Sequence, residues 1–436
     1  MAVIYRSRYM VPISSAPLEH GALLVEQGRI TAVGSADVLQ RRYPALPCHD
    51  FGDAIVLPAF INAHTHLELS HAPRWFAAAG EDVAASGGFT DWILRLIRAK
   101  IALKPGAQEY RAAWDDGWRQ SLATGTATVG DILSVPDLCA HSAAVLGGCS
   151  FVEIIGHDAV RVGQRLQQVD DCRDLRGHHC WGVAPHAPYT LSDELLRQCC
   201  RFAAVRHLRT TIHLAESEDE MQLLSAVDGP MAQQLYPFVG WEEYLPLRRC
   251  QRPLEMLERA GGLNDATTLV HGVHLNRSEI ARVAAAGCAV VLCPRSNAAL
   301  KVGTAPAADY LNAGVTLALG ADSLASNATL SLWDEMEFAL HWFSGDLGCA
   351  TLLRMCTIDA ATALYGAAAD GLGSLAAGAP ATFQVLRPDK LPQLDAIYPF
   401  LCQGARSAEV EQVFIGGDRC YLAPDAATED EQESDR

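Results

Sequence analysis

Short apolar runs alternate with amphipathic stretches through most of the chain. Eight of the runs have the length and composition of buried strands, at residues 55–64, 126–132, 150–156, 180–186, 210–214, 267–272, 288–294 and 315–322. The segments between them carry apolar residues at helical spacing, as in 277–286, which ends at Gly287. Regular alternation of eight strands with helices predicts an α/β fold, a (β/α)8 TIM barrel of parallel strands.

The two ends of the chain have a different texture, with apolar and polar residues alternating around turn signals. Gln27-Gly28 separates two strand-like runs near the N-terminus, and similar runs return at 381–388 and 410–422. We expect both ends to pair into one small β-sandwich. The predicted domains are 1–55 and 367–425 for the two parts of the sandwich, 56–366 for the barrel, and 426–436 for a disordered acidic tail.

Composition limits the binding partners and the cellular compartment that we expect for this protein. The 34 Lys and Arg against 51 Asp and Glu give a net charge of −17, which disfavours nucleic-acid binding. The chain has no apolar run of signal-peptide length at its N-terminus and no charge-free apolar segment of membrane-spanning length. The 14 cysteines include no Cys-x-x-Cys pair, so we expect packed, reduced thiols. A cytoplasmic protein without membrane contact is predicted.

Polar residues with metal-binding side chains close several of the predicted strands. They are His64 and His66 in the first, His213 in the fifth, His271 in the sixth and Asp322 in the eighth. Parallel strands of a barrel end at one rim, and residues i and i+2 of an extended segment point to the same side. His64, His66, His213 and Asp322 would supply three nitrogens and one oxygen, which suits Zn²⁺ with one open position.

Fe²⁺ and Mn²⁺ remain alternatives to Zn²⁺ at this site. One ion per subunit is expected rather than two, because no lysine lies near the end of the fourth strand, where a modified lysine could bridge two ions. A bound ion of this kind lowers the pKa of water from ~15.7 toward ~7. Glu216, three residues after His213, could then serve as acid or base. The acidic residues 218–220 are expected to form only a helix first turn.

Six ordered motifs carry a family resemblance, namely NAHTHLELS, APHAPYTLS, HLAES, HGVHL, CPRSNAALKVG and LGADSLASN. The chain resembles the amidohydrolase superfamily over residues 1 to about 425, and most closely its mononuclear deaminase and chlorohydrolase branch. The resemblance implies a metal bound by His64, His66, His213 and Asp322. It implies a proton shuttle at Glu216, while His271 would orient the attacking hydroxide.

Hydrolytic deamination is the reaction that these roles imply. Asp322 or Glu216 would accept a proton from the attacking water, and Glu216 would protonate a ring nitrogen of the substrate. His271 would stabilise the charge that develops as ammonia leaves. The sequence leaves open how the proton transfers divide between the two carboxylates.

Six further residues at the predicted rim are expected to contact the substrate: Asp91, Trp92, His186, Arg295, Ser296 and Asn297. Asp91 lies where related deaminases hold ribose hydroxyls with a carboxylate, although a shorter one than the family's Glu. Trp92 could instead simply begin an amphipathic helix. Arg295 could pair with a substrate anion, and the two residues after it could line the pocket or fix the loop.

The residues Leu67-Glu68-Leu69 after the histidine pair look most like those of aminodeoxyfutalosine deaminases. The resemblance therefore implies 6-amino-6-deoxyfutalosine, on a route to menaquinone, as the small-molecule substrate. Alternatives are a deaminase of S-adenosylhomocysteine, methylthioadenosine, guanine or pterins, and a triazine amino- or chlorohydrolase. A metal-free scaffold protein is disfavoured because every ligand of the motif set is present. The resemblance also suggests a homodimer.

Overall fold

The computed structural model describes residues 2–81, 87–135, 137–145, 148–173, 180–247, 251–404, 406–424 and 426. The predicted acidic tail lies outside the described residues except for residue 426. The chain forms two compact units: Met1–Asn62 with Trp118–Thr128 and Ser331–Arg436, and Ala63–Gly117 with Val129–Leu330. These units divide the chain at other points than the predicted domain boundaries, which stay a prediction.

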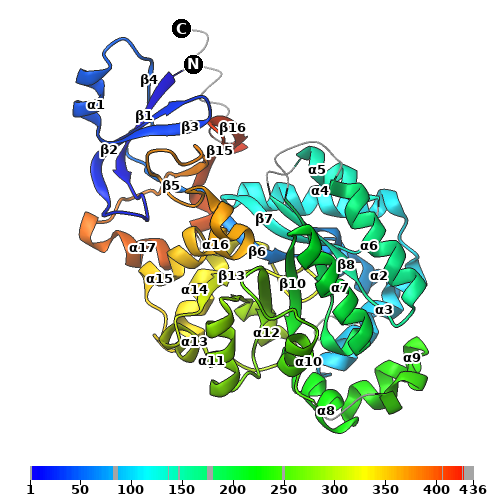
Figure 1. The fold of residues 1–436 in the computed structure, drawn as a ribbon. Helices are drawn as coiled ribbons and strands as arrows, with labels where there is room; N and C mark the ends of the chain where they lie inside the picture. The colour runs from blue at the N-terminus through cyan, green and yellow to red at the C-terminus, as the bar shows by residue number, and fades with distance from the viewer. Residues whose placement is uncertain are drawn as a thin grey trace. The chain divides into compact units, whose positions relative to one another are not determined.

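Eight parallel strands form the predicted barrel (Figure 1). In chain order they are β6 (Phe60–Thr65), β7 (Thr126–Leu133), β8 (Cys149–Ile154), β9 (Cys180–Pro185), β10 (Arg209–Leu214), β11 (Thr267–His271), β12 (Ala289–Leu292) and β13 (Thr316–Leu319). Each strand pairs with the next, and a parallel bridge between Thr65 and Asp322 nearly closes the sheet. Every residue of β7 is buried, as expected for strands covered on both faces. The predicted fold class is confirmed.

Helices connect these strands. They are α2 (Ala72–Ala79), α3 (Phe89–Leu103), α4 (Ala107–Ala123), α5 (Leu138–Val145), α6 (Ala159–Arg173), α7 (Asp193–Arg206), α8 (Glu218–Ala226), α9 (Tyr236–Val239), α10 (Pro253–Arg259), α11 (Arg277–Ala286), α12 (Pro294–Leu300) and α13 (Ala307–Asn312). The longest connections follow β6 and β10, and both supply walls of the cavity described below. None of the helices in the described ranges has the length and hydropathy needed to cross a membrane.

Both chain ends build a second, mixed sheet. Its strands are β1 (Ala2–Met10), β2 (Leu18–Glu26), β3 (Arg29–Ser35), β4 (Cys48–Asp50), β5 (Ile55–Pro58), β14 (Phe383–Leu386), β15 (Val410–Ile415) and β16 (Asp418–Leu422). Figure 1 shows the blue N-terminal strands together with the red strands β15 and β16. Phe383 and Phe414 stack with ring centroids 4.5 Å apart in a core shared with N-terminal residues such as Leu23. The remaining helices of this unit are α1 (Ala36–Arg42), α14 (Leu332–Trp342), α15 (Cys349–Met355), α16 (Ile358–Tyr365) and α17 (Ile397–Cys402).

The first predicted strand, 55–64, proved to be two. Residues Ile55–Pro58 pair with β1 and β14 in the terminal sheet, and Phe60–Thr65 begins the barrel. The chain leaves the first strand at Pro58, which has no N–H to donate, and the Ala59 N–H donates to the Thr382 carbonyl oxygen instead. Both strands are fully buried, so the apolar run gave no sign of the division.

The described cysteines form no disulfide, and the reduced state of the thiols stays a prediction.

Candidate active site

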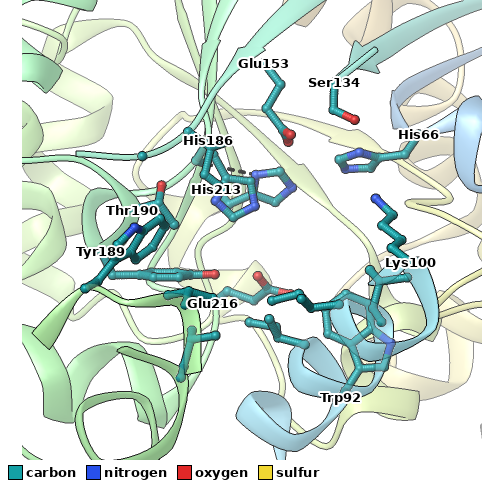
Figure 2. Close-up of a pocket in the computed structure, with 18 of the residues that line it drawn as sticks. His66, Trp92, Lys100, Ser134, Glu153, His186, Tyr189, Thr190, His213 and Glu216 are labelled. Atoms are coloured by element: carbon teal, nitrogen blue, oxygen red, sulfur yellow. Dashed lines mark hydrogen bonds between the residues drawn. The ribbon is translucent and has the colours of Figure 1, made fainter. Parts of the chain in front are cut away.

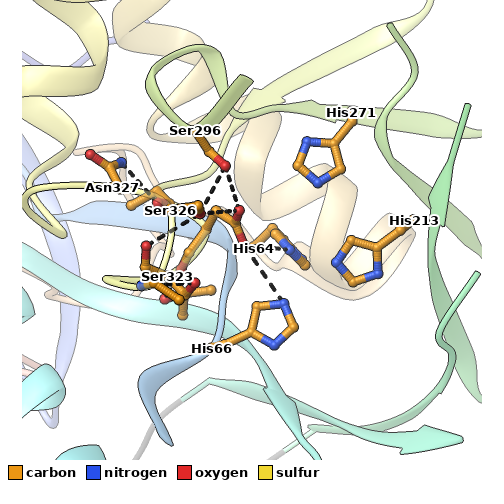
Figure 3. A network of polar contacts seen from close by, with 12 residues as sticks. His64, His66, His213, His271, Ser296, Ser323, Ser326 and Asn327 are labelled. Atoms are coloured by element: carbon orange, nitrogen blue, oxygen red, sulfur yellow. Dashed lines mark hydrogen bonds and ion pairs between the residues drawn. The ribbon is translucent and has the colours of Figure 1, made fainter. Parts of the chain in front are cut away.

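The predicted metal ligands converge at the carboxyl ends of the barrel strands (Figure 3). Nitrogen atoms of His64, His66 and His213 all lie within 4.8 Å of one another. The Asp322 Oδ1 atom lies 3.6 Å from His64 Nε2 and 3.7 Å from His66 Nε2. These residues come from β6, β10 and the turn after β13, so only the closed barrel brings them together.

Two imidazoles of this cluster, those of His66 and His213, are held in their neutral form. Burial, together with the neighbouring His64, lowers the pKa of His66 and of His213 well below the usual value. The His213 Nδ1–H donates to the His186 carbonyl oxygen over 2.9 Å, which leaves Nε2 with a free lone pair. Neutral imidazoles with fixed tautomers are the form in which histidine binds metals.

Two serines fix the carboxylate of Asp322. Its Oδ2 atom accepts hydrogen bonds from Ser296 Oγ at 2.6 Å and from Ser326 Oγ at 2.7 Å, so Oδ1 remains directed toward the histidines. Burial opposes ionisation of Asp322, but the adjacent imidazole of His64 and its neighbours outweigh this effect and hold its pKa well below the usual range. An ionised, oriented carboxylate beside three converging imidazoles fits a divalent cation.

Glu216 and His271 face each other beside this cluster. Glu216 Oε1 lies 3.4 Å from His271 Nε2, and both side chains are buried. Burial, reinforced by the nearby Asp322, raises the pKa of Glu216 well above its usual value, while burial lowers the pKa of His271 to about 4. The His271 Nδ1–H donates to Asn297 Oδ1 at 2.9 Å, so its Nε2 points toward Glu216.

Backbone strain accompanies three residues at this rim. Ala215, His271 and Asp322 adopt φ values of 51°, 69° and 56° in the left-handed region. Such conformations are costly for residues other than glycine, and they cluster where a side chain or backbone must take a specific direction. His271 ends β11, Ala215 directly follows β10, and Asp322 lies three residues after the end of β13, each at a turn beside the site.

Glu220 supports the strained turn before Glu216. Its side chain is fully buried, and its Oε2 atom accepts the Glu216 N–H at 2.8 Å. The sequence predicted only a helix first turn here, and α8 does begin at Glu218 with the acidic residues in its first turn. Only its position four residues after Glu216 could have indicated in the sequence that the Glu220 side chain contacts this turn.

Replacing Glu220 with Gln should change how stability depends on pH. Burial raises the pKa of Glu220 to about 7, from 4.5 in the unfolded chain, so the folded protein keeps a proton that the unfolded chain loses. The wild type therefore loses stability relative to Glu220→Gln as pH rises from 4.5 to 7, by up to about 3 kcal/mol. Urea unfolding of both proteins at pH 5 and pH 8 measures this. A difference in unfolding free energy that is equal at both pH values contradicts the assignment.

A cavity of about 550 Å³ opens in front of the histidines (Figure 2). Of the predicted substrate contacts, Trp92 and His186 line it, and the other four do not. Asp91 is partly exposed and pairs with Arg95 at 3.2 Å, and Arg295 Nη1 donates to Thr329 Oγ1. Ser296 and Asn297 form hydrogen bonds with the side chains of Asp322 and His271, and whether they also contact substrate or fix the loop stays a prediction. The structure does not bring Asp91 or Arg295 into the cavity, and their substrate roles stay a prediction.

The cavity wall also contains polar residues that the sequence did not predict to contact the substrate. They include Glu68, Lys100, Ser134, Glu153 and Tyr189. Glu153 had one available signal, because it is the single charged residue within the predicted strand 150–156. Lys100 lies on an amphipathic helix, where a lysine is expected to face solvent, so nothing in the sequence indicated that it lines the cavity.

Comparison with known proteins agrees with this geometry. A protein 33% identical over 345 residues is the aminodeoxyfutalosine deaminase of Deinococcus radiodurans, covering 74% of this chain and 77% of the relative. A 5-methylthioadenosine/S-adenosylhomocysteine deaminase of Nitratidesulfovibrio vulgaris is 30% identical and covers 93% of this chain and 88% of its own.

Among solved structures, an adenosine deaminase from Xanthomonas campestris with bound zinc superimposes with a TM-score of 0.81 at 25% identity. The match covers 99% of this chain and 97% of that one. The sequence profile of a bacterial imidazolonepropionase-like composite domain matches residues 21–45. The profile of the amidohydrolase family matches residues 55–420, which is most of the chain. The chain therefore belongs to the amidohydrolase family.

Proposed function

We propose that this protein, a hydrolase acting on carbon–nitrogen bonds, removes the amino group of a purine nucleoside. The convergence of three imidazoles, an oriented aspartate and the Glu216–His271 pair at one cavity carries the proposal. The names of the relatives, deaminases of aminodeoxyfutalosine and of 5-methylthioadenosine and S-adenosylhomocysteine, support an adenine nucleoside derivative as the substrate.

The site is proposed to hold one Zn²⁺ per chain through His64, His66, His213 and Asp322. When bound, zinc lowers the pKa of a water molecule toward ~7 and so supplies a nucleophile at neutral pH. The donor set of three nitrogens and one oxygen matches hydrolytic zinc sites. The zinc in the related Xanthomonas structure supports this choice over Fe²⁺ and Mn²⁺.

The protein's own residues would move the protons. Glu216, buried at the cavity and with its pKa raised, is proposed to donate a proton to the ring nitrogen next to the carbon under attack. Asp322, ionised and held by two serines, would accept a proton from the attacking water. Neutral His271, whose Nδ1–H donates to Asn297, would accept a hydrogen bond from the attacking hydroxyl group through Nε2 and so orient it toward the substrate.

The first substrate to test is 6-amino-6-deoxyfutalosine. The relative with 33% identity carries that activity in its name, and the Leu67-Glu68-Leu69 segment resembles the same group. The carboxylate of Glu68 accepts hydrogen bonds from the backbone N–H groups of Ser134 and Val135. This structural role does not distinguish one of these substrates from another. S-adenosylhomocysteine and 5′-methylthioadenosine are the alternatives supported by the second relative.

Ammonia release across a substrate panel tests the proposal. The panel contains 6-amino-6-deoxyfutalosine, S-adenosylhomocysteine, 5′-methylthioadenosine, adenosine, guanine, a pterin and a chlorotriazine, with chloride release followed for the last. We expect at least one adenine nucleoside to reach a kcat/KM of ~10⁴ M⁻¹s⁻¹ or more. Release of chloride, or of ammonia from guanine or the pterin alone, would overturn the nucleoside proposal. The absence of any turnover by the metal-loaded protein would favour a scaffold.

A further inference from the structure

One buried carboxylate of the cavity has no role in the chemistry proposed above. Glu153 lies at the end of β8 and is 8% exposed. Figure 2 shows its carboxylate directed into the cavity, on the opposite side from Glu216. No hydrogen bond or ion pair joins this carboxylate to any other residue within the described ranges, although it lies in the field of Lys100 and Arg165. A buried carboxylate in that situation is available to a ligand.

The other acidic residues of the cavity are already engaged or exposed. Glu68 holds the loop after β7 through Ser134 and Val135, and Asp158 is exposed and caps α6 through the Val160 N–H. Glu243 is exposed on the connection that follows β10. Of the carboxylates that line the cavity apart from Glu216 and Asp322, Glu153 is therefore the buried one with no partner among described residues.

A cation accompanies Glu153 in the same wall. Lys100 extends from α3 into the cavity on the side of His66, as Figure 2 shows. Its ammonium lies 5.9 Å from the ring centroid of Tyr110, and it forms no ion pair in the described part of the chain. Its charge nevertheless acts on both Glu68 and Glu153. The same cavity is thus lined by a strong acceptor and a strong donor, and neither forms an ion pair among the described residues.

We propose that Glu153 and Lys100 bind the sugar hydroxyl groups of the nucleoside. A hydroxyl both donates and accepts, so neighbouring hydroxyls match a carboxylate and an ammonium that face one cavity. This role is the one that sequence reasoning gave to Asp91, whose carboxylate the structure pairs with Arg95 outside the cavity lining. The proposal rests on the proposed nucleoside deaminase function and specifies how the substrate is recognised.

Inhibition by two nucleosides that differ only in their hydroxyls tests the assignment. Adenosine and 2′,3′-dideoxyadenosine are measured as competitors of the best nucleoside substrate in the panel. For the wild type we expect the inhibition constant of the dideoxy compound to exceed that of adenosine by ~10- to 100-fold, the size of hydrogen bonds to charged groups. Glu153→Met should lower this ratio at least about threefold by weakening adenosine alone, while the contact with Lys100 keeps it above 1. Glu153→Gln, which keeps an acceptor, should restore part of it.

Three further variants and one binding measurement complete the test. Lys100→Met should also lower the ratio, and calorimetric binding of both nucleosides replaces inhibition for any variant without turnover. Glu243→Gln, which removes an exposed carboxylate of the same cavity, should leave the ratio unchanged. A ratio that persists in Glu153→Met, or that collapses in Asp91→Asn instead, overturns the assignment. Failure of the wild type to deaminate any nucleoside overturns the proposed function itself, which is a distinguishable result.

Discussion

Replacing Glu216 with Gln is expected to lower kcat about 10³-fold, the usual contribution of a general acid or base. The amide has the same shape as the carboxyl group but cannot deliver a proton to the substrate ring. Glu216 is 5% exposed, and its Oε1 atom lies 3.4 Å from His271 Nε2. Its carboxyl group is therefore buried at the position from which a proton would be delivered. Steady-state kinetics on the best substrate of the panel measures the effect.

The same variant should keep its metal and its affinity for substrate. Glu216 faces His271 and is not among the four proposed ligands, so metal content should remain equal to that of the wild type. A kcat within about tenfold of the wild type would remove Glu216 from proton transfer. Loss of metal along with activity would instead make it a ligand.

Replacing His66 with Ala is expected to abolish stoichiometric metal binding and, with it, turnover. The imidazole is one of three that meet at a common centre, and its side chain is only 12% exposed. A bound ion supplies several kcal/mol of transition-state stabilisation, so a fall in kcat of ~10³-fold or more is expected. Metal analysis and kinetics on the same preparation measure both effects.

His274→Ala provides the matched control. His274 follows His271 by three residues, but its Nε2–H donates to the Val302 carbonyl oxygen at 2.9 Å, away from the cluster. Its removal should leave the metal content unchanged. Equal metal content in the His66 and His274 variants would show that the histidine cluster does not hold the ion.

The barrel was predictable because its strands are short, apolar and separated by well-marked helices. Helix α11 shows how local chemistry sets an element's limits. Asn276 caps its start by accepting the Ser278 and Glu279 N–H groups, and Gly287 ends it with φ 72°. The hairpin at Gln27-Gly28 was also predictable, because glycine favours the positive φ that a two-residue type I′ turn requires. In the structure both residues have positive φ values, 51° and 76°.

The division of 55–64 into two strands was not predictable from apolar patterning. Burial is complete on both sides of Ala59, and only pairing with distant partners shows that Ile55–Pro58 belongs to the terminal sheet. That choice depends on β14, more than 300 residues away, so no local signal could have revealed it.

The candidate metal ligands could be located because strand ends collect at one rim, whereas the substrate wall could not. Glu153 and Lys100 are brought together by the path of α3 and the end of β8, which depends on the packing of a long connection. Asp91 illustrates the same limit. It precedes Trp92 by one residue, yet only Trp92 lines the cavity, because adjacent helical residues point about 100° apart.

Anomalous diffraction at the zinc edge, from crystals of protein purified with its native metal, tests the metal centre most directly. We predict one peak per chain, about 2.0–2.2 Å from a nitrogen of His64, His66 and His213 and from Asp322 Oδ1. A peak at another place, two peaks at the rim, or ligands that omit Asp322 or any of the three histidines would contradict the proposed site.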